Sequence, residues 1–240
     1  PLNLITIITG VSGSGKTTLI RKVLFNGIKR KLRYYNFKKP KCDAINIDLN
    51  NIDNIDFISQ NSIKTSSKSN PITYVKAFDN IRNLYASLAK ARIQGLIPKD
   101  FSFNVKGGRC ESCKGQGYTI IEMQFMSDIS LVCETCEGQR YQQKVLDIKY
   151  QNKNIFELLN TTIEECYDFF NKNEQQKIAQ QLTPLLDVGL GYLNLGQASN
   201  TLSSGETQRL KIASFLTKRL TNSILIFDEP TKGLHYHDIK

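Results

Sequence analysis

The sequence predicts an α/β fold, in which a core of strands, loops and helices is interrupted by a largely helical region that carries a cysteine module. Three observations predict this fold class. The apolar, β-branched run Leu4–Ile8 leads into a glycine-rich loop and then a helix. A second apolar run, Ile224–Phe227, ends in two acidic residues. Between these runs lie segments of helical periodicity and two Cys-x-x-Cys pairs.

The glycine-rich loop matches the fixed positions of a phosphate-binding P-loop, since it reads Gly10-Val-Ser-Gly-Ser-Gly15-Lys16-Thr17. Its backbone N–H groups are expected to surround a β-phosphate, and the following helix adds its N-terminal dipole. Lys16 is expected to reach the β- and γ-phosphates, and the Thr17 hydroxyl to ligate Mg²⁺. We expect Leu4–Ile8 to form a buried strand in front of this loop. The predicted nucleotide-binding residues of the loop are Gly10, Ser12, Gly13, Ser14, Gly15, Lys16, Thr17 and Thr18.

The apolar run Ile224–Phe227 complements the P-loop because it is followed by Asp228 and Glu229. A strand that ends in this way delivers two carboxylates to the bound nucleotide. Asp228 is expected to contact the nucleotide and hold Mg²⁺, and Glu229 to polarise the attacking water as general base. Lys16 and Glu229 are therefore predicted to be catalytic.

Four cysteines lie in two Cys-x-x-Cys pairs that are nineteen residues apart: Cys110, Cys113, Cys133 and Cys136. This spacing predicts a zinc site. Each pair is followed by one residue and a glycine, Gly115 or Gly138, which permits the positive φ of a tight turn. Four thiolates close the tetrahedron around the metal, so the zinc is predicted to be structural rather than catalytic.

Helical periodicity marks the remaining regular structure. We expect one helix over residues Tyr74–Ile93, a second over Glu164–Leu186 with a break near Pro184, and a third over Ser203–Arg219. The polar segment Ser62–Pro71 is expected to be a loop.

Composition narrows the class of protein. The 240 residues are 40% hydrophobic, which suffices for a core, and no apolar run approaches the roughly 20 residues of a membrane helix. The length, the metal-like cysteine spacing and the lack of a signal pattern argue against a secreted disulfide framework and indicate the cytoplasm. Cys42 and Cys166 are expected to be ordinary buried thiols.

The formal net charge is +10, and no acidic residue occurs in the first 41 residues. A segment that contains many lysines and arginines and no acidic residue favours a polyanionic partner. The alternative is that the Asn-, Ile- and Lys-rich composition reflects a genome-wide bias. Charge alone therefore does not identify a nucleic-acid partner.

The segment Leu202-Ser-Ser-Gly-Glu-Thr-Gln-Arg209 opens a helix between the two nucleotide-binding motifs. It resembles the signature motif of ATP-binding-cassette ATPases. Further family-specific stretches are Ser69–Val75, Phe101–Lys114, Ile121–Ile129 and Val188–Ala198. With a zinc module placed before the signature, the whole chain resembles the second nucleotide-binding half of the UvrA family, the damage-sensing subunit of bacterial UvrABC excision repair.

The resemblance assigns further residues. Ser203 and Gly205 would touch the γ-phosphate held by an opposing P-loop. Gln60, which follows the strand-like run Ile55–Ile58, would be the catalytic Q-loop glutamine, and Asp238 the D-loop aspartate. The resemblance also implies a division of the chain: core 1–61, helical signature region 62–104, zinc module 105–143, helical region 144–200, and signature helix with the second part of the core 201–240.

The function implied is ATP-dependent recognition of damaged DNA in nucleotide excision repair, with ATP, Mg²⁺ and Zn²⁺ as cofactors. The implied partners are damaged duplex DNA, the first nucleotide-binding half, a second UvrA copy in a homodimer, and UvrB, without a membrane. The basic residues of the zinc module that could face phosphates are Lys106, Arg109, Lys114, Arg140 and Lys144. The alternative for each of them is an ordinary solvated side chain. Its aromatic residues are expected to pack rather than stack on bases: Tyr118, Phe125 and Tyr141.

Two positions depart from the family pattern: Ser204 replaces a glycine of the signature, and Lys232 replaces a threonine after the acidic strand. If position 204 needs a positive φ, serine costs on the order of 1 kcal/mol there. The switch histidine of the family is expected downstream of Lys240, and neither His235 nor His237 replaces it. Two alternative functions stay open: a drug-resistance paralogue with weakened DNA binding, and a fragment that binds nucleotide and zinc without turnover.

Overall fold

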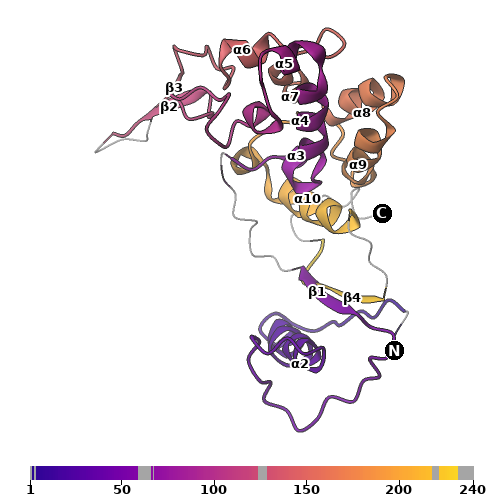
Figure 1. Ribbon diagram of the computed structural model, residues 1–240. Coiled ribbons are helices and arrows are strands. Elements are labelled where there is room, and N and C mark those ends of the chain that lie inside the picture. The colour runs from indigo at the N-terminus through magenta and orange to yellow at the C-terminus, as the bar shows by residue number, and fades with distance from the viewer. Residues whose placement is uncertain are drawn as a thin grey trace. The chain divides into compact units, whose positions relative to one another are not determined.

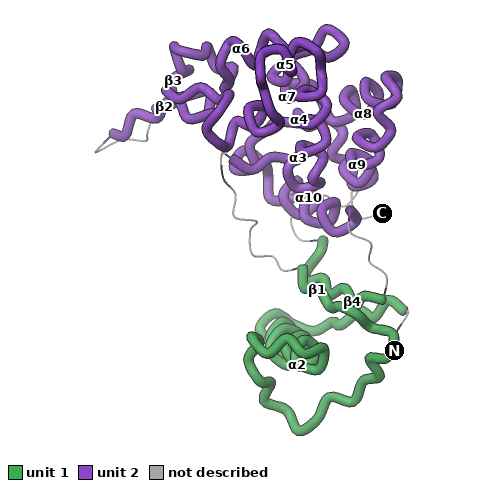
Figure 2. The backbone as a smooth tube through the Cα atoms, in the orientation of Figure 1, with its two compact units in different colours: residues 1–61, 219–240 green, residues 62–218 purple. Residues whose placement is uncertain are grey.

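The computed structural model describes residues 2, 4–58, 66, 68–123, 129–217 and 222–231. The chain forms two compact units, one of residues 1–61 with 219–240 and one of residues 62–218, which Figure 2 shows in green and purple. We call them unit 1 and unit 2. Unit 1 contains the P-loop and the acidic strand, and unit 2 contains the cysteine module and the signature motif.

Unit 1 contains a parallel pair of strands, β1 (Asn54–Ile58) and β4 (Ser223–Phe227), which are far apart in the sequence. Their register runs from Asn54 opposite Ser223 to Ile58 opposite Phe227. Both strands were predicted from their apolar, β-branched composition, and both predictions are confirmed. A continuous helical segment follows the P-loop: α1 (Lys16–Thr18), the π-helical η1 (Leu19–Phe25) and α2 (Asn26–Lys31).

The predicted buried strand Leu4–Ile8 is wrong. These residues have no regular structure, and Leu4 and Ile5 are 71% and 94% exposed. A strand forms only where a neighbouring strand completes its hydrogen bonds. Within the described part of unit 1, β1 and β4 pair with each other and not with this run. Apolar, β-branched composition therefore indicates that a segment can form a strand, but it does not indicate whether another strand lies beside it.

The predicted helix over Tyr74–Ile93 is divided into α3 (Pro71–Tyr74), α4 (Ala77–Ser87) and α5 (Ala89–Ile93). Lys76 has a left-handed φ of 58°, and Leu88 is extended, so each interrupts the helical hydrogen bonds. The apolar face of α4 is nevertheless the predicted one, since its buried side chains include Phe78, Ile81 and Tyr85. The 3₁₀ turn η2 (Pro98–Phe101) follows.

The second predicted helix breaks earlier than expected. It forms α8 (Ile163–Lys172) and α9 (Gln176–Asp187), which pack against each other, with α7 (Ile155–Leu159) preceding them (Figure 1). Glu174 has a φ of 60° in the connection, and Asn173 donates its side-chain amide to the Phe169 carbonyl. Pro184 lies inside α9 instead of ending it. The helix breaks where the chain reverses between α8 and α9, and helical periodicity does not encode the position of such a reversal.

The core of unit 2 is apolar and continuous from α3 to α10 (Ser204–Leu216), the signature helix that was predicted from Ser203. Leu210 and Ala213 of α10 are fully buried in it. The remaining elements are α6 (Gln143–Leu146), η3 (Ser199–Thr201) and the antiparallel hairpin of β2 (Tyr118–Ile121) and β3 (Ile129–Val132). No helix in the described ranges combines the length and the apolar composition needed to cross a membrane.

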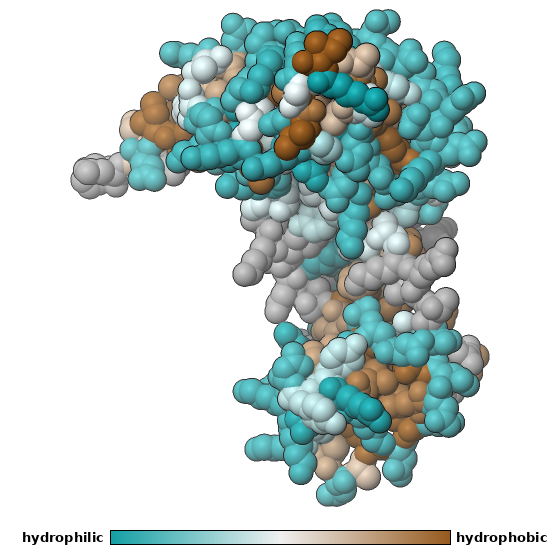
Figure 3. Space-filling model, viewed as in Figure 1, coloured by the Kyte–Doolittle hydropathy of each residue, from teal (hydrophilic) through white to brown (hydrophobic). Residues whose placement is uncertain are grey.

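The hairpin of β2 and β3 leaves apolar side chains in solvent, and hydrophobic colour gathers on it in Figure 3. Ile121 and Ile129 lie opposite each other in the register and are 46% and 44% exposed. Two-stranded hairpins are only marginally stable alone. This one extends directly from the cysteine module, since Gly117 and Cys133 close its base with a backbone hydrogen bond of 3.0 Å.

Candidate metal and nucleotide sites

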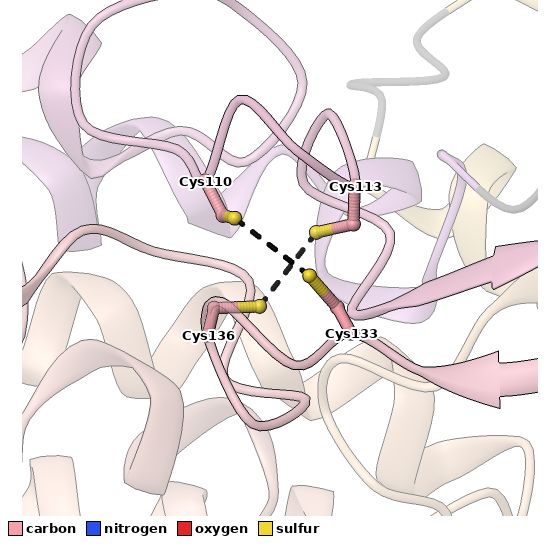
Figure 4. A group of neighbouring side chains, drawn as sticks. All are labelled: Cys110, Cys113, Cys133 and Cys136. Carbon is pink, nitrogen blue, oxygen red and sulfur yellow. Dashed lines mark hydrogen bonds between the residues drawn. The ribbon is translucent and has the colours of Figure 1, made fainter.

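The four predicted zinc ligands converge in unit 2, where their sulfurs all lie within 4.8 Å of one another (Figure 4). Sγ of Cys110 lies 3.9 Å from Sγ of Cys133, and Sγ of Cys113 lies 3.7 Å from Sγ of Cys136. All four side chains are buried, and none forms a disulfide. The spacing of the two pairs therefore predicted the cluster.

The cluster fits a tetrahedral metal ion. Zn²⁺ holds thiolate sulfur at about 2.3 Å, which places the sulfurs of a tetrahedral site about 3.8 Å apart. The two sulfur–sulfur distances of 3.9 and 3.7 Å match that value. A disulfide requires only about 2.05 Å. A metal ion held by all four sulfurs would have no position left for a reacting molecule.

Glycine turns build the cluster. Gly115 has a φ of 82° and Gly138 a φ of 81°, so the positive φ values expected after each cysteine pair are confirmed. At Gly115 an added Cβ would lie 1.9 Å from the Phe103 carbonyl oxygen, so the turn also packs against a neighbouring chain segment. The N–H of Gly117 donates to the Cys113 sulfur at 3.2 Å, as expected for a turn that stabilises a thiolate.

The surroundings shift the pKa values of two of the thiols in opposite directions. Burial acts against the charged form of Cys133, but N–H groups of Cys136 and Thr135 outweigh it and lower the pKa of Cys133 to about 7. At Cys136 burial prevails and raises the pKa of the thiol to about 12. A bound cation would favour the thiolate at every ligand, so metal binding would release protons.

The basic residues of the module divide into two groups. Lys106, Lys114 and Lys144 are exposed. Arg109, which we expected to face phosphates, is instead buried: its guanidinium donates to the Glu111 carboxylate at 3.1 and 3.3 Å and to the Asn104 carbonyl at 3.1 Å. The bonds from Arg109 to the carboxylate hold the pKa of Glu111 below its usual value. The charge of Arg109 is thus matched within the protein.

Arg140 is half-buried and stacks over the Phe103 ring, with 5.6 Å between its guanidinium carbon and the ring centroid. Tyr141 is buried against Phe103 and donates to the Phe101 carbonyl at 3.0 Å, so its predicted packing role is confirmed. Tyr118 is half-buried, and Phe125 lies outside the described residues.

In unit 1 the P-loop and the acidic strand meet. Thr17 donates its hydroxyl to Asp228 Oδ1 at 3.0 Å, across 211 residues of sequence. The backbone N–H of Asp228 donates to the Ile58 carbonyl at 3.0 Å, which continues the β1–β4 ladder and fixes the carboxylate at the strand end. A hydroxyl and a carboxylate in contact form an oxygen donor pair of the kind that Mg²⁺ prefers.

The loop itself is exposed and contains left-handed glycines. Gly13 and Gly15 have φ values of 80° and 86°, and an added Cβ at either would meet nothing within 4 Å. The Lys16 ammonium folds over the loop and donates to the carbonyls of Gly10 and Val11 at 2.7 and 2.8 Å. Lys16 is half-buried, and an ammonium that donates to neutral carbonyls can exchange them for phosphate oxygens. Ser12, Ser14 and Thr18 are exposed.

Glu229 follows Asp228 with a left-handed φ of 49°, which is uncommon for a residue other than glycine. Several residues with assigned roles lie outside the described residues: Gln60, Lys232, His235, His237 and Asp238.

The signature motif in unit 2 forms a capping box at the start of α10. Ser203 Oγ accepts the N–H of Glu206 at 3.2 Å, and the Glu206 carboxylate accepts the N–H of Ser203 at 2.7 Å. Ser204 is the first helical residue and does not have a positive φ, so serine at this position carries no left-handed strain. Gly205 is buried in the first turn.

Two residues beside this cap were not identified from the sequence. Tyr192 donates its hydroxyl to Glu206 Oε1 at 2.8 Å, and Arg209 donates to the Tyr192 oxygen at 3.4 Å. Their stretches had been recognised as family-specific without a physical role. The expectation that Cys42 is buried is wrong, because that thiol is exposed, whereas Cys166 is fully buried, as expected.

Comparisons with known proteins support the nucleotide motifs. Residues 111–232, about half of the chain, match the sequence model of the ABC transporter family. The whole chain aligns with UvrABC system protein A of Clostridium tetani at 51% identity and of Methanothermobacter thermautotrophicus at 46% identity. Each alignment covers 100% of this chain and 25% of the relative. The chain therefore spans about a quarter of the length of these relatives.

A solved structure agrees with the fold. UvrA2 from Deinococcus radiodurans superimposes with a TM-score of 0.84 at 38% identity, over 96% of this chain and 27% of that one. The predicted fold class, an ATP-binding-cassette core with an inserted cysteine module, is thereby confirmed, as is the resemblance to UvrA. The chain belongs to the ABC transporter family of ATP-binding-cassette proteins, and over its whole length it is similar to a segment of UvrA.

Proposed function

We propose that this chain is the nucleotide-binding segment of an ATPase that recognises damaged DNA in nucleotide excision repair. The observation that carries the proposal is the contact of Thr17 with Asp228, since it joins the two motifs that an ATP·Mg²⁺ site requires. The named relatives supply the repair context, because the chain is similar throughout to UvrABC system protein A.

In the proposed site each residue of the P-loop has a separate task. The N–H groups between Gly10 and Thr18 hold the phosphates, and Lys16 moves from the loop carbonyls onto the β- and γ-phosphates. Thr17 and Asp228 would hold Mg²⁺, which when bound neutralises phosphate charge. Glu229 accepts a proton from the attacking water as general base. We assign Gln60 to the same site on the family resemblance alone.

The signature motif completes a site on another nucleotide. Ser203 Oγ already accepts the Glu206 N–H, so its own hydroxyl proton remains for a γ-phosphate oxygen, beside the buried Gly205. In the cassette arrangement that phosphate belongs to an opposing half, so this chain supplies half of each of two composite sites. ATP then favours the closed arrangement because its γ-phosphate is bound by both halves only there.

The cysteine cluster is proposed to hold structural Zn²⁺, and the three exposed lysines of the module to contact DNA phosphates: Lys106, Lys114 and Lys144. Backbone contact without base readout suits the recognition of distorted duplex. The reduced, metal-like cysteines favour the cytoplasm. A first nucleotide-binding half, a second copy and UvrB are the proposed protein partners, and the domain division given above remains part of the proposal.

ATP turnover by the full-length protein tests the proposal. Lys16→Ala removes the cation that stabilises the developing phosphate charge, so turnover should be abolished. Glu229→Gln should retain ATP binding and lose turnover. Lys22→Ala, a nearby exposed lysine, is the matched control and should retain the parent rate. Parent-level turnover by Lys16→Ala or Glu229→Gln would contradict the assigned roles.

DNA binding tests the second part. Affinity for damaged and undamaged duplex is measured at two salt concentrations for the parent and for a variant with Lys106, Lys114 and Lys144 replaced by alanine. The salt slope should decrease by up to about one unit per lost phosphate contact. Lys172→Ala, exposed at the end of α8, is the control. An unchanged slope places the DNA contact elsewhere, and no DNA binding by the parent favours the resistance paralogue.

A further inference from the structure

A carboxylate lies in the first turn of α10, beside the helix N-terminus that the proposed function assigns to a γ-phosphate. Both of its oxygens are engaged. Glu206 Oε2 accepts the Ser203 N–H at 2.7 Å, and Glu206 Oε1 accepts the Tyr192 hydroxyl at 2.8 Å. Arg209, one turn further along α10, donates to the Tyr192 oxygen at 3.4 Å and to the Gly189 carbonyl at 3.3 Å. Two chain segments thus hold one carboxylate.

The carboxylate needs such restraint because of its charge. A phosphate that approaches the helix N-terminus is attracted by the free N–H groups and the dipole, but a carboxylate in the same turn repels it. The repulsion is smallest when the carboxylate is hydrogen-bonded and held in one orientation. A Glu206 side chain released from Tyr192 gains rotamers, some of which place its charge nearer the incoming phosphate or uncap Ser203.

We propose that Tyr192 is a positioning residue for the signature motif: its hydroxyl, supported by Arg209, holds Glu206 on the Ser203 N–H and thereby keeps the carboxylate away from the γ-phosphate. Tyr192 does not touch the nucleotide in this scheme. It acts through Glu206 on Ser203, whose hydroxyl proton stays available to the phosphate. The inference rests on the proposed function, since it concerns the same composite ATP site.

The surroundings of Tyr192 support this role. Tyr192 is 57% exposed, but its two chain neighbours are held to α8: the Ile163 N–H donates to the Leu193 carbonyl at 2.9 Å and the Glu164 N–H to the Gly191 carbonyl at 3.1 Å. The hydroxyl is therefore presented from a fixed loop. Burial opposes ionisation of Glu206, yet the bonds from Ser203 and Tyr192 prevail and keep the pKa of Glu206 below its usual value. Burial and the Glu206 bond raise the pKa of Tyr192.

The experiment uses Tyr192→Phe, which removes only the hydroxyl. Steady-state ATP turnover of the full-length protein should show a kcat about fivefold lower, as expected for one lost hydrogen bond to a charged group, and a KM for ATP within about twofold. Glu206→Gln removes the charge that needs restraint. The double variant Tyr192→Phe/Glu206→Gln should therefore have a kcat closer to that of Glu206→Gln alone than the additive expectation allows. Tyr167→Phe, a half-buried tyrosine of α8, is the matched control.

A second measurement does not depend on turnover. Hydrogen exchange at the Ser203 amide, which Glu206 caps, should be several-fold faster in Tyr192→Phe and unchanged in Tyr167→Phe. A parent that hydrolyses ATP, loses turnover with Lys16→Ala and keeps its kcat in Tyr192→Phe refutes the inference while the proposed function stands. A parent without ATP turnover refutes the proposed function instead. In that case unchanged Ser203 exchange in Tyr192→Phe also removes the structural basis of the inference.

Discussion

The cysteine module of unit 2 and the P-loop of unit 1 were both recognised from motifs, yet the structure builds them differently. All four sulfurs come from 27 consecutive residues, and they are buried and at metal-binding distances. The P-loop is exposed and obtains its acidic partner, Asp228, from 211 residues away. The first site is determined almost entirely by local turns, whereas the second depends on the pairing of distant strands. Local sequence therefore specifies the arrangement of the four sulfurs in the cysteine module. For the P-loop it specifies the kinds of residues but not the position of their acidic partner.

The largest expected effect is on the cysteine module. Cys113→Ser removes one ligand from a closed site, and metal binding contributes directly to the stability of such modules, at about 10 kcal/mol or more in small zinc domains. Purified Cys113→Ser should lose stoichiometric zinc in metal analysis and unfold at a distinctly lower temperature. The matched control is Cys42→Ser, because Cys42 is exposed and distant in sequence from the cluster.

Equal zinc content in the parent and in Cys113→Ser would show that the cluster does not bind the metal. A parent without zinc under reducing conditions would contradict the metal site altogether.

The next largest expected effect is on the free energy of unfolding, and it should differ between two isoleucines of unit 1. Ile55 in β1 is 0% exposed, and replacing it by alanine should cost about 2–5 kcal/mol of unfolding free energy. Ile5 in the run that was wrongly predicted as a buried strand is 94% exposed, so Ile5→Ala should change stability by no more than about 0.5 kcal/mol. Denaturant unfolding of the 240-residue chain measures both. A cost at Ile5 that equals the cost at Ile55 would mean that Leu4–Ile8 is buried in solution.

These two isoleucines show what sequence can predict here. Composition and periodicity located β1, β4 and α10: β1 and β4 pair with each other, and Leu210 and Ala213 of α10 are buried in the core of unit 2. The same reasoning failed at Leu4–Ile8, where the composition suits a strand but no strand of the described residues pairs with it. It also joined α3, α4 and α5 into one helix, because a lysine in the sequence gives no sign of the left-handed φ that Lys76 adopts.

The candidate sites follow the same division. The cysteine ligands and the turns at Gly115 and Gly138 could be predicted because ligand spacing and glycine encode them. Tyr192 could not, since nothing in its own segment indicates that its hydroxyl reaches Glu206, fourteen residues later. The structure also differs from the expectation at Arg109, because a charged residue in a basic module gives no sign of the ion pair with the exposed Glu111.

A smaller effect on stability is expected at two glycines, which differ in the space around them although both have a positive φ. At Gly115 an added Cβ would clash with the Phe103 carbonyl and also require a φ of 82°, whereas Gly95 has a φ of 66° and open space. Gly95→Ala should therefore cost only the left-handed strain, about 1 kcal/mol. Gly115→Ala should cost about 3 kcal/mol because the backbone must shift as well. Denaturant unfolding with zinc present compares the pair, and equal costs would show that the turn at Gly115 adapts freely.

The smallest expected effect concerns a helix cap in unit 2 that is local in sequence, like the cysteine turns. At the start of α8 the Thr162 N–H donates to the Glu165 carboxylate at 3.0 Å, and the Glu165 N–H donates to the Thr162 hydroxyl at 3.2 Å. The pKa of Glu165 lies below its usual 4.5, mainly because its carboxylate accepts the Thr162 N–H. The Thr162 side chain also lowers this pKa, to a smaller extent. Because the folded-state pKa is depressed, the cap stabilises the helix fully above about pH 4.5 and is lost as the pH falls through the folded value.

Hydrogen exchange at the Thr162 amide between pH 6 and pH 3 measures this loss, after correction for the intrinsic pH dependence of exchange. Protection should decrease in the parent as Glu165 becomes protonated. In Glu165→Gln the side-chain oxygen still accepts a hydrogen bond but does not titrate, so protection should be weaker at pH 6 and nearly independent of pH. If the parent retains full protection at pH 3, the cap does not depend on the carboxylate charge, and the backbone ladder between Ile163 and Leu193, whose N–H and carbonyl lie 2.9 Å apart, must fix this helix end instead.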